Sequence, residues 1–515
     1  MISLNRTAIP GVVPRWMGQP ATIPLVAALA GIATAIVGSL AGTRAVYYVA
    51  VLALIGVTSM VAVTRREPLR FVFLALIACF PIAFAEVPPG RFGLTVFDVV
   101  MLVLAIGLVA KKMFSPEATG APLLPTKSLL IAWLLTIPCV AFSQFPLLSL
   151  QALVVNFAIQ AFFLFTFDEL KRKDGLERLV LLLSIVTLFM AIGLFVDHVL
   201  HMNLSLRGSN LNQLSYVAGM EVWRAGGFFQ DPQRAGAFLA CTITFLLLLS
   251  IRGRFHNMKM RFVVWMAIVA GLAALMITVS RSAILACLSV SALALFAFHR
   301  GNVAVRLAIT VGMALLALLV ALAPVETWLY VFPDNVAQRL LQSRTEFEDR
   351  LFIWRDTWDM FADHPLVGIG LGSFQSYLAG TRPMVLHYYG IGEAAGVVYI
   401  PDQPESGYLK ILYEGGIVGC VAALLVAGDA LRRAIVLIIG KNVDPDVHTE
   451  VIAALAGLTT FAITFITQFT VSDKRIAGIF AFLLAVIWHR SLQHTRHATD
   501  GMLKNGKSNG RSRTE

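Results

Sequence analysis

The chain has 515 residues, of which 58% are hydrophobic and 14% charged, and its formal net charge is +11. Soluble globular proteins contain about 25% charged residues, so this composition excludes a water-soluble enzyme and any disordered or fibrous class. A basic charge of this size suggests nucleic acid as a partner of a soluble protein, but in a membrane protein it reflects topology. We therefore expect an all-α, polytopic membrane helical bundle with no nucleic-acid partner.

Apolar segments recur along the whole chain. A helix of about 20 apolar residues crosses the roughly 30 Å of bilayer hydrocarbon, and about 14 segments approach that length. We predict spans at 22–41, 45–63, 71–85, 95–110, 128–142, 150–167, 179–199, 233–251, 262–278, 282–298, 307–325, 407–431, 450–468 and 475–490. The third segment is the weakest of these predictions, because it is short and contains Pro81.

The charge of the connecting loops predicts the orientation of the bundle. With 14 spans, the basic loops all fall on one side, including those that contain Arg70, Lys111, Arg172, Arg254 and Arg433. Positive residues collect in cytoplasmic loops, so this side is the cytoplasm and both termini lie in it. The polar, basic residues 491–515 are predicted to form a disordered cytoplasmic tail.

Two long segments fall on the opposite side, at about 200–232 and 326–406. We therefore divide the chain into helices 1–11 in residues 1–325, a large periplasmic loop at 326–406 and helices 12–14 in residues 407–490. Nucleotides are absent from that side, and the sequence contains neither a P-loop nor a GxGxxG motif after a strand. We expect no cofactor.

The cysteines indicate neither a metal site nor a disulfide framework. None of the five forms a CxxC pair, and all lie within or at the ends of apolar segments. They are Cys79, Cys139, Cys241, Cys287 and Cys420. We interpret them as small buried hydrophobic residues and expect no metal.

The outer loop contains a helical pattern at 337–363. Apolar side chains recur there at intervals of three and four residues, which is typical of one face of an amphipathic helix. They are Phe347, Leu351, Trp354, Trp358 and Phe361. This face would lie on the membrane surface or pack on the other helices. Three glycines follow Pro365, as a hinge or as a turn that directs backbone N–H groups at an anion.

The basic residues of the outer loop are all arginines. Residues 326–406 contain five arginines and no lysine, and Arg350 is one of them. Arg224 lies in the shorter outer segment, and Arg281 lies at the outer end of the tenth predicted span. A guanidinium is always charged and binds phosphate in a bidentate manner, so the group suits a lipid diphosphate. Pairing with acidic residues of the loop is the alternative for each single arginine.

Four stretches of the C-terminal 300 residues resemble the O-antigen ligase and polymerase superfamily of bacterial inner membranes, in the order typical of that family. They are RAGGFFQDPQRAGAFLA (224–240), TVSRSAILA (278–286), RLFIWRDTWDMFADHPLVGIGLGSF (350–374) and ESGYLKILYEGGIVG (405–419). Gln233 stands where asparagine is usual, Glu405 replaces a histidine of the ligases, and Ser406 replaces an asparagine. The replaced histidine favours a polysaccharide polymerase over a ligase.

The resemblance implies metal-independent glycosyl transfer at the periplasmic face of the inner membrane. The donor would be a glycan on undecaprenyl diphosphate, and the acceptor a hydroxyl of a growing exopolysaccharide or O-antigen chain. Arg224, Arg281 and Arg350 would stabilise the diphosphate leaving group, and Glu405 would be the general base. An ion pair with an arginine or Lys410 is the alternative role for Glu405. Other partners would be polysaccharide export and chain-length proteins.

Three other functions compete with the polymerase: an O-antigen ligase that transfers the glycan to another acceptor, a flippase for the lipid-linked glycan, and a scaffold. A transporter is typically built from repeats, with charged or broken-helix sites at the bilayer midplane, which this sequence does not indicate. An outer loop without lysine has no evident use in a scaffold. The carboxylates Asp98, Asp197 and Asp429 lie close to the predicted interfaces, so we do not assign them to the site.

Overall fold

The computed structural model describes most of the chain beyond residue 66. The described residues are 67–81, 95–114, 127–201, 204, 214–217, 220–229, 231–255, 257–298, 307–308, 311–312, 315, 343–381, 404–440, 443–468, 471 and 473–511. Of the predicted spans, 22–41 and 45–63 lie outside these residues and 307–325 lies largely outside them.

The described part is a bundle of apolar helices, and the chain is a multi-pass membrane protein. Seven helices are long and apolar enough to cross a membrane, and four shorter apolar helices accompany them. The long helices are α6 (Pro146–Leu170), α7 (Gly175–Leu200), α8 (Pro232–Ile251), α9 (Met258–Ile277), α17 (Gly407–Ile439), α18 (Pro445–Thr467) and α19 (Lys474–Arg511). The shorter ones are α3 (Pro68–Ala78), α4 (Val96–Phe114), α5 (Lys127–Ala141) and α10 (Arg281–Phe298). The total of 14 spans stays a prediction.

Local sequence signals set the helix starts. Proline occupies the first turn of α3, α6, α8 and α18, where its missing N–H leaves no hydrogen bond unmade. The carboxylates of Asp231 and Asp444 cap α8 and α18 by accepting from backbone N–H groups two residues further on. These caps explain why the start of α8 lies within one residue of the start predicted for the eighth span.

Two predicted boundaries differ from the structure. The third span was predicted at 71–85, but α3 covers Pro68–Ala78, because Pro81 lacks the N–H that a continuing helix needs. Residues 491–515 were predicted to be disordered, but α19 continues as a helix to Arg511. No proline interrupts that stretch, and the packed first turns supply the nucleus from which a helix extends.

Helix α8 lies at the centre of the bundle and contacts α7, α9, α10, α18 and α19. Almost all of its side chains are buried, as expected for a helix that is apolar on every face. Small residues allow close approach: a Cβ at Gly457 of α18 would lie 2.9 Å from a methyl carbon of Leu483. Four of the five cysteines are buried and Cys420 is half-buried, which confirms their interpretation as small buried residues.

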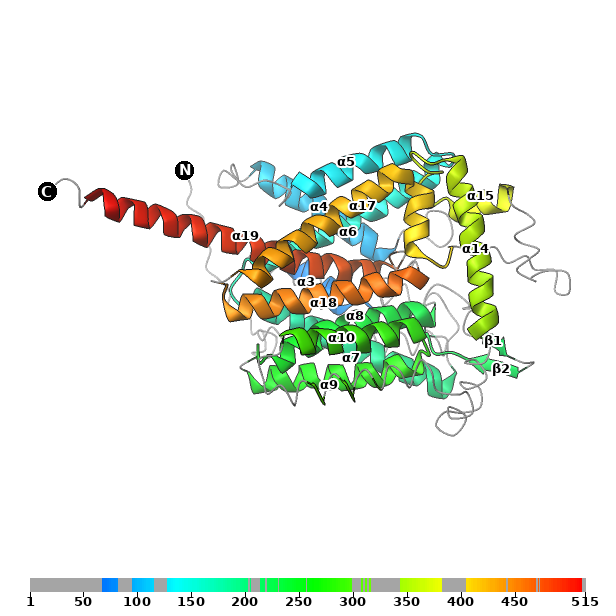
Figure 1. Cartoon of the computed structure of the whole chain (residues 1–515), viewed down its shortest axis with the longest axis horizontal. Helices are drawn as coiled ribbons and strands as arrows, with labels where there is room; N and C mark the ends of the chain where they lie inside the picture. Colours follow the sequence, from blue (N-terminus) through cyan, green and yellow to red (C-terminus); the bar gives the residue numbers. More distant parts are fainter. Residues whose placement is uncertain are drawn as a thin grey trace, which may run out of the picture.

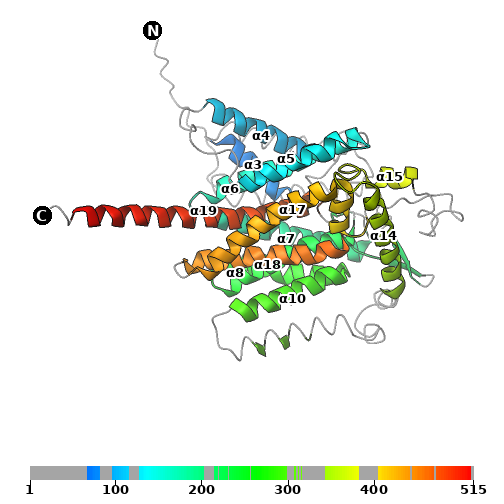
Figure 2. The ribbon, with the colours of Figure 1, turned by 45° about the horizontal axis from the view of Figure 1, so that its top comes forward.

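Two further helices and one hairpin lie beyond one end of the bundle. Helix α14 (Ser343–Asp363) crosses that end, with α15 (Phe374–Thr381) beside it (Figures 1 and 2). The antiparallel strands β1 (Leu214–Val217) and β2 (Met220–Trp223) form the hairpin, with Leu214 opposite Trp223. A small apolar cluster joins α14 and α15 to α17. It consists of Met360, Ile369, Phe374, Tyr377, Leu378 and Tyr413.

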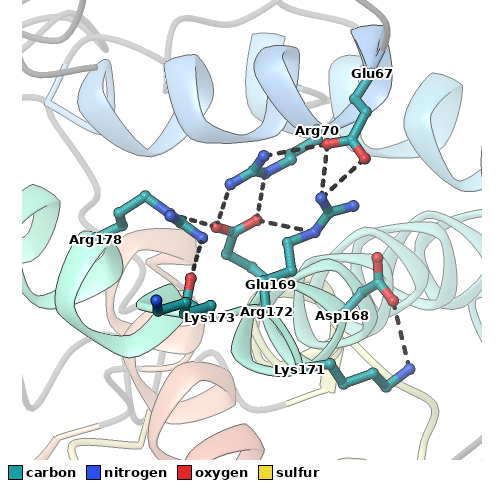
Figure 3. A network of polar contacts seen from close by, with 8 residues as sticks. All are labelled: Glu67, Arg70, Asp168, Glu169, Lys171, Arg172, Lys173 and Arg178. Atoms are coloured by element: carbon teal, nitrogen blue, oxygen red, sulfur yellow. Dashed lines mark hydrogen bonds and ion pairs between the residues drawn. The ribbon is translucent and has the colours of Figure 1, made fainter. Parts of the chain in front are cut away.

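Ion pairs close the opposite end of the bundle. Glu169 at the end of α6 is 2% exposed and accepts hydrogen bonds from Arg70 at 2.7 Å and from Arg178 at 2.9 Å (Figure 3). Glu67 binds Arg172 at 2.7 Å. These contacts tie α3 and α6 to the start of α7. The arginines of this cluster belong to the loops that the positive-inside rule assigns to the cytoplasm.

Helix α17 is broken at Gly416, where φ is 60° and ψ is −160°. The break pairs with the glycine-rich turn that follows α14. Ile417 donates its backbone N–H to the carbonyl of Pro365 at 2.8 Å, and Gly370 donates to the carbonyl of Glu414 at 3.0 Å. The carboxylate of Glu414 accepts from the backbone N–H of Gly372 at 2.9 Å. These hydrogen bonds attach the turn to α17. The N–H groups of Gly370 and Gly372 therefore bind acceptors of the protein itself rather than an anion.

Candidate functional site

Several helices begin or end at the end of the bundle that α14 crosses (Figures 1 and 2). Helices α8, α10, α17 and α19 begin there, and α7, α9 and α18 end there. A Cβ at Gly236 of α8 would lie 2.6 Å from the Cβ of Ser280, which precedes α10. Gln468 at the end of α18 donates to the hydroxyl of Ser282 at 3.1 Å. These contacts bring together the segments that contain two of the four predicted site residues, Arg224 and Arg281.

Arg224 begins a short segment, residues 224–229, between β2 and α8. Its side chain is 7% exposed. The carboxylate of Asp197, near the end of α7, accepts the backbone N–H groups of Gly226 at 2.8 Å and Gly227 at 2.6 Å. The φ of Gly227 is +56°, which a residue with a side chain adopts only at a cost. A buried carboxylate therefore fixes the backbone next to Arg224.

The start of α19 fixes the same segment from the other side. Asp473 and Arg475 form a bidentate ion pair, with distances of 2.9 Å from Nε to Oδ1 and 2.6 Å from Nη2 to Oδ2. Arg475 also donates to the carbonyl of Phe228 at 2.8 Å, and its guanidinium lies 3.8 Å from the ring centre of Phe229. Such a stacked, hydrogen-bonded guanidinium is held in one orientation.

Asp473 is surrounded by positive charge. Burial alone raises the pKa of a carboxylate, but Arg475, and to a smaller extent Arg234, hold the pKa of Asp473 below its usual value. Arg234 lies in the first turn of α8 and is 8% exposed. Asp473 therefore stays ionised between two buried guanidinium groups.

Lys474 points to a different partner. It forms a buried ion pair with Asp98 in the first turn of α4, whose carboxylate also accepts from the backbone N–H of Thr95 at 2.7 Å. Sequence analysis left Asp98 out of the site, and the structure gives it this link between α4 and α19. The three consecutive residues at the start of α19 thus link it to α4 and to the segment 224–229.

Arg281 is the first residue of α10, and its side chain is half-buried. The turn before it is tight. Val279 has a φ of +52°, and Ser280 donates its backbone N–H to the hydroxyl of Thr278 at 3.3 Å. A β-branched residue at positive φ is an outlier that the surrounding structure must stabilise. The backbone conformation therefore fixes the point at which Arg281 leaves the α9–α10 turn.

Glu405 lies just before α17 and also has an unusual backbone, with a φ of +51°. Its side chain is half-buried. The indole N–H of Trp354, on α14, donates to its carbonyl at 3.4 Å. Val279 and Glu405 are two of the four non-glycine residues with positive φ in the described part of the chain. Glu405 is itself a predicted site residue, and Val279 lies two residues before another, Arg281.

Arg350 lies in α14, which crosses the same end, although its side chain lies outside the described part. Helix α14 does not bury the whole face that its sequence pattern predicts. Leu351 is 46% exposed and Trp358 is 55% exposed, whereas Ile353 and Met360 are buried. Exposed leucine and tryptophan side chains of this kind are typical of an amphipathic helix that lies in the membrane interface.

Sequence analysis did not identify the residues that hold this end together. Asp197 was set aside because it lies close to an interface, and the sequence Asp473-Lys474-Arg475 was not considered. Three consecutive charged residues immediately before an apolar span are the signal that was available. Among the described residues there is no group of three or more side chains able to hold a metal ion.

A family model described as O-Antigen ligase matches residues 266–424. The matched segment begins within α9 and ends within α17, so it includes Arg281, Arg350 and Glu405. Arg224 and the start of α19 lie outside it. No curated protein matches the chain.

Proposed function

We propose that the chain, whose residues 266–424 match a family model described as O-Antigen ligase, transfers a glycan from undecaprenyl diphosphate to an acceptor sugar hydroxyl. The reaction extends exopolysaccharide or O-antigen chains on the periplasmic face of a bacterial inner membrane. In this arrangement the bundle has 14 spans, both termini are cytoplasmic, and α14 belongs to the periplasmic loop 326–406.

The proposed step is a single displacement. The acceptor hydroxyl oxygen attacks the anomeric carbon of the donor, and the bond from that carbon to the diphosphate oxygen breaks. The hydroxyl proton passes to a base, and the diphosphate leaves with the bonding electron pair. Because negative charge develops on that oxygen, fixed guanidinium groups nearby lower the barrier. One such donor contributes roughly 3–4 kcal/mol, or about 10²–10³ in rate.

The observation that carries this proposal is the position of the arginines. Arg224 and Arg234 are buried at the end of the bundle where Arg281 begins α10. Buried arginines are expensive to desolvate and are retained where they bind an anion or an acidic partner. In a lipid-linked donor the diphosphate lies at the membrane surface. It would therefore lie close to this end of the bundle and to its arginines.

Glu405 is the proposed general base. Its strained backbone is held by Trp354 of α14 and precedes α17, so the outer loop and the membrane helices both fix its position. Partial burial beside the membrane would favour proton uptake by a carboxylate. A glutamate in place of the histidine of the ligases supports a polymerase rather than a ligase.

The test is to replace Arg224, Arg281, Arg350 and Glu405 one at a time in a strain that lacks the natural gene, and to score glycan length on a gel. We expect short or absent polymer and accumulation of single lipid-linked repeat units on the outer leaflet. Arg172→Ala, at the opposite end of the bundle, is the matched control and should give normal polymer. Full-length glycan from all four variants would contradict the site assignment.

The same strains separate the competing functions. A flippase defect leaves the lipid-linked units on the inner leaflet, whereas a polymerase defect leaves them on the outer leaflet. A ligase defect leaves full-length glycan on undecaprenyl diphosphate. The proposed orientation is tested by single cysteines labelled from the outside: a cysteine at residue 359, an exposed polar position of α14, should react with an impermeant maleimide, and one at residue 172 should not.

A further inference from the structure

We infer that Asp197 and the Asp473–Arg475 pair are positioning residues that fix the segment 224–229 and thereby direct Arg224 at the donor diphosphate. This inference rests on the proposed function. It concerns three residues outside the segment that the family model matches. None of them needs to touch the substrate.

The segment needs external support because of its composition. It contains two adjacent glycines, Gly226 and Gly227, and glycine loses more conformational freedom on ordering than any other residue. Two short elements flank it, the strand β2 and the capped start of α8. A side chain at its first position is held at one place only if the glycine backbone is fixed.

Asp197 supplies the first fixed point. Both glycine N–H groups donate to the same carboxylate oxygen of Asp197, at 2.8 Å and 2.6 Å. Hydrogen bonds to an ionised acceptor are roughly twice as strong as those between neutral groups. Asp197 is fully buried near the end of α7, so its position is set by the bundle and not by the loop.

The Asp473–Arg475 pair supplies the second fixed point for the segment 224–229. Arg475 donates to the carbonyl of Phe228 and stacks on Phe229, while Asp473 binds the other two guanidinium nitrogens. Removing the carboxylate would free Arg475 to rotate, and the carbonyl of Phe228 would lose its fixed donor. The segment is thus held between α7 and α19, although 247 residues separate Arg475 from Phe228.

A neighbouring ion pair provides the control. Lys474 and Asp98 are also buried, and they also join the start of α19 to another helix. The hydrogen bonds of Lys474 to Thr95 and Asp98 join α19 to the start of α4. Loss of the Lys474–Asp98 pair should therefore reduce stability without specifically affecting Arg224.

The experiment uses the full chain in lipid nanodiscs with a synthetic undecaprenyl diphosphate-linked repeat unit. Initial rates and donor affinity are measured for Asp473→Asn, Arg475→Lys, Asp197→Asn and the control Asp98→Asn. We expect the first two variants to lose about tenfold to a hundredfold in rate, the size of a small misplacement of a catalytic group. Their KM for the acceptor should not change, and the control should stay within threefold of the wild type.

A double-mutant cycle separates positioning from a structural role. In an Arg224→Lys background, Asp473→Asn should cost less than threefold, because the group that it positions is already impaired. Fully additive losses would overturn the inference, as would a wild-type rate for both Asp473→Asn and Arg475→Lys. If Asp473→Asn does not fold, Arg475→Lys, which keeps the charge, and Asp197→Asn carry the same test. An unaffected Arg224→Ala variant would overturn this inference alone, whereas full-length glycan from all four site variants would contradict the site assignment of the proposed function.

Discussion

Replacing Gly416 by alanine should disrupt the contact between α17, at its break, and the turn that follows α14. The φ and ψ of Gly416 lie in a region that is open almost only to glycine, and an alanine there stores about 1–3 kcal/mol of strain. Its Cβ would lie 2.4 Å from the carbonyl oxygen of Leu366. The hydrogen bonds from Ile417 to Pro365, at 2.8 Å, and from Val418 to Leu366, at 3.0 Å, would then be displaced.

Each of these hydrogen bonds contributes roughly 0.5–1.5 kcal/mol net, so the total expected loss of unfolding free energy is about 2–6 kcal/mol. The assay is thermal unfolding of the purified chain in detergent, with hydrogen exchange of residues 365–374 as a local readout. Gly428→Ala is the matched control, because it lies on the same helix and its new Cβ meets nothing within 4 Å. Helix propensity predicts that this control gains up to about 1 kcal/mol.

The outcome that refutes this reasoning is a Gly416→Ala protein that melts at or above the temperature of Gly428→Ala. A lower melting temperature with unchanged exchange at 365–374 would place the damage elsewhere in α17. Activity is a separate readout. We expect Gly416→Ala to reduce glycan transfer, because these hydrogen bonds join the turn after α14 to α17, the helix that follows Glu405.

Three further predictions follow from single contacts. Glu414→Gln should lower the unfolding free energy by about 1–3 kcal/mol, measured by thermal unfolding, because the carboxylate holds the backbone N–H of Gly372 at 2.9 Å. Hydrogen bonding to Arg172 lowers the pKa of Glu67 below its usual value of 4.5. The ion pair therefore stabilises the fold above pH 4.5, and this stabilisation is lost as the pH falls through the lowered pKa. The melting difference between wild type and Glu67→Gln, about 0.2–1 kcal/mol for an exposed pair, should be present at pH 7 and shrink below about pH 4. Brominated lipid should quench the fluorescence of Trp358, measured as the difference between wild type and Trp358→Phe; equal quenching of both would place this face of α14 away from the membrane.

The helices could be predicted from the sequence because their signals are local. An apolar run determines that a span exists, and Asp231 followed by Pro232 determines where α8 begins. The same logic failed at Pro81, where hydropathy extended the third span through a residue that ends a helix. In α14 the periodicity indicated a helix but did not identify the buried face, because hydrophobic side chains occur both on its exposed face, such as Trp358, and on its buried face, such as Met360.

The candidate site was predictable only in part, and for a physical reason. Arg224, Arg281 and Glu405 could be proposed from the sequence because each lies in a motif of neighbouring residues. Asp197 and Arg475 act on the backbone of residues 226–228, and these bonds depend on how α7 and α19 pack, which no local pattern encodes.

The contacts nevertheless obey a rule that a sequence can express. A buried carboxylate or guanidinium in a membrane protein is costly unless it is paired, so each charge near the end of an apolar span implies a partner at the same depth. Asp98, Asp197 and Asp473 all lie close to span ends, and in the structure each has such a partner: Lys474, the glycine N–H groups and Arg475. The residues around Arg224 could therefore have been grouped by their predicted depth in the membrane, although they lie far apart along the chain. By that criterion, a charged residue close to an interface is a reason to look for its partner. Asp197 would then have been kept among the candidate site residues.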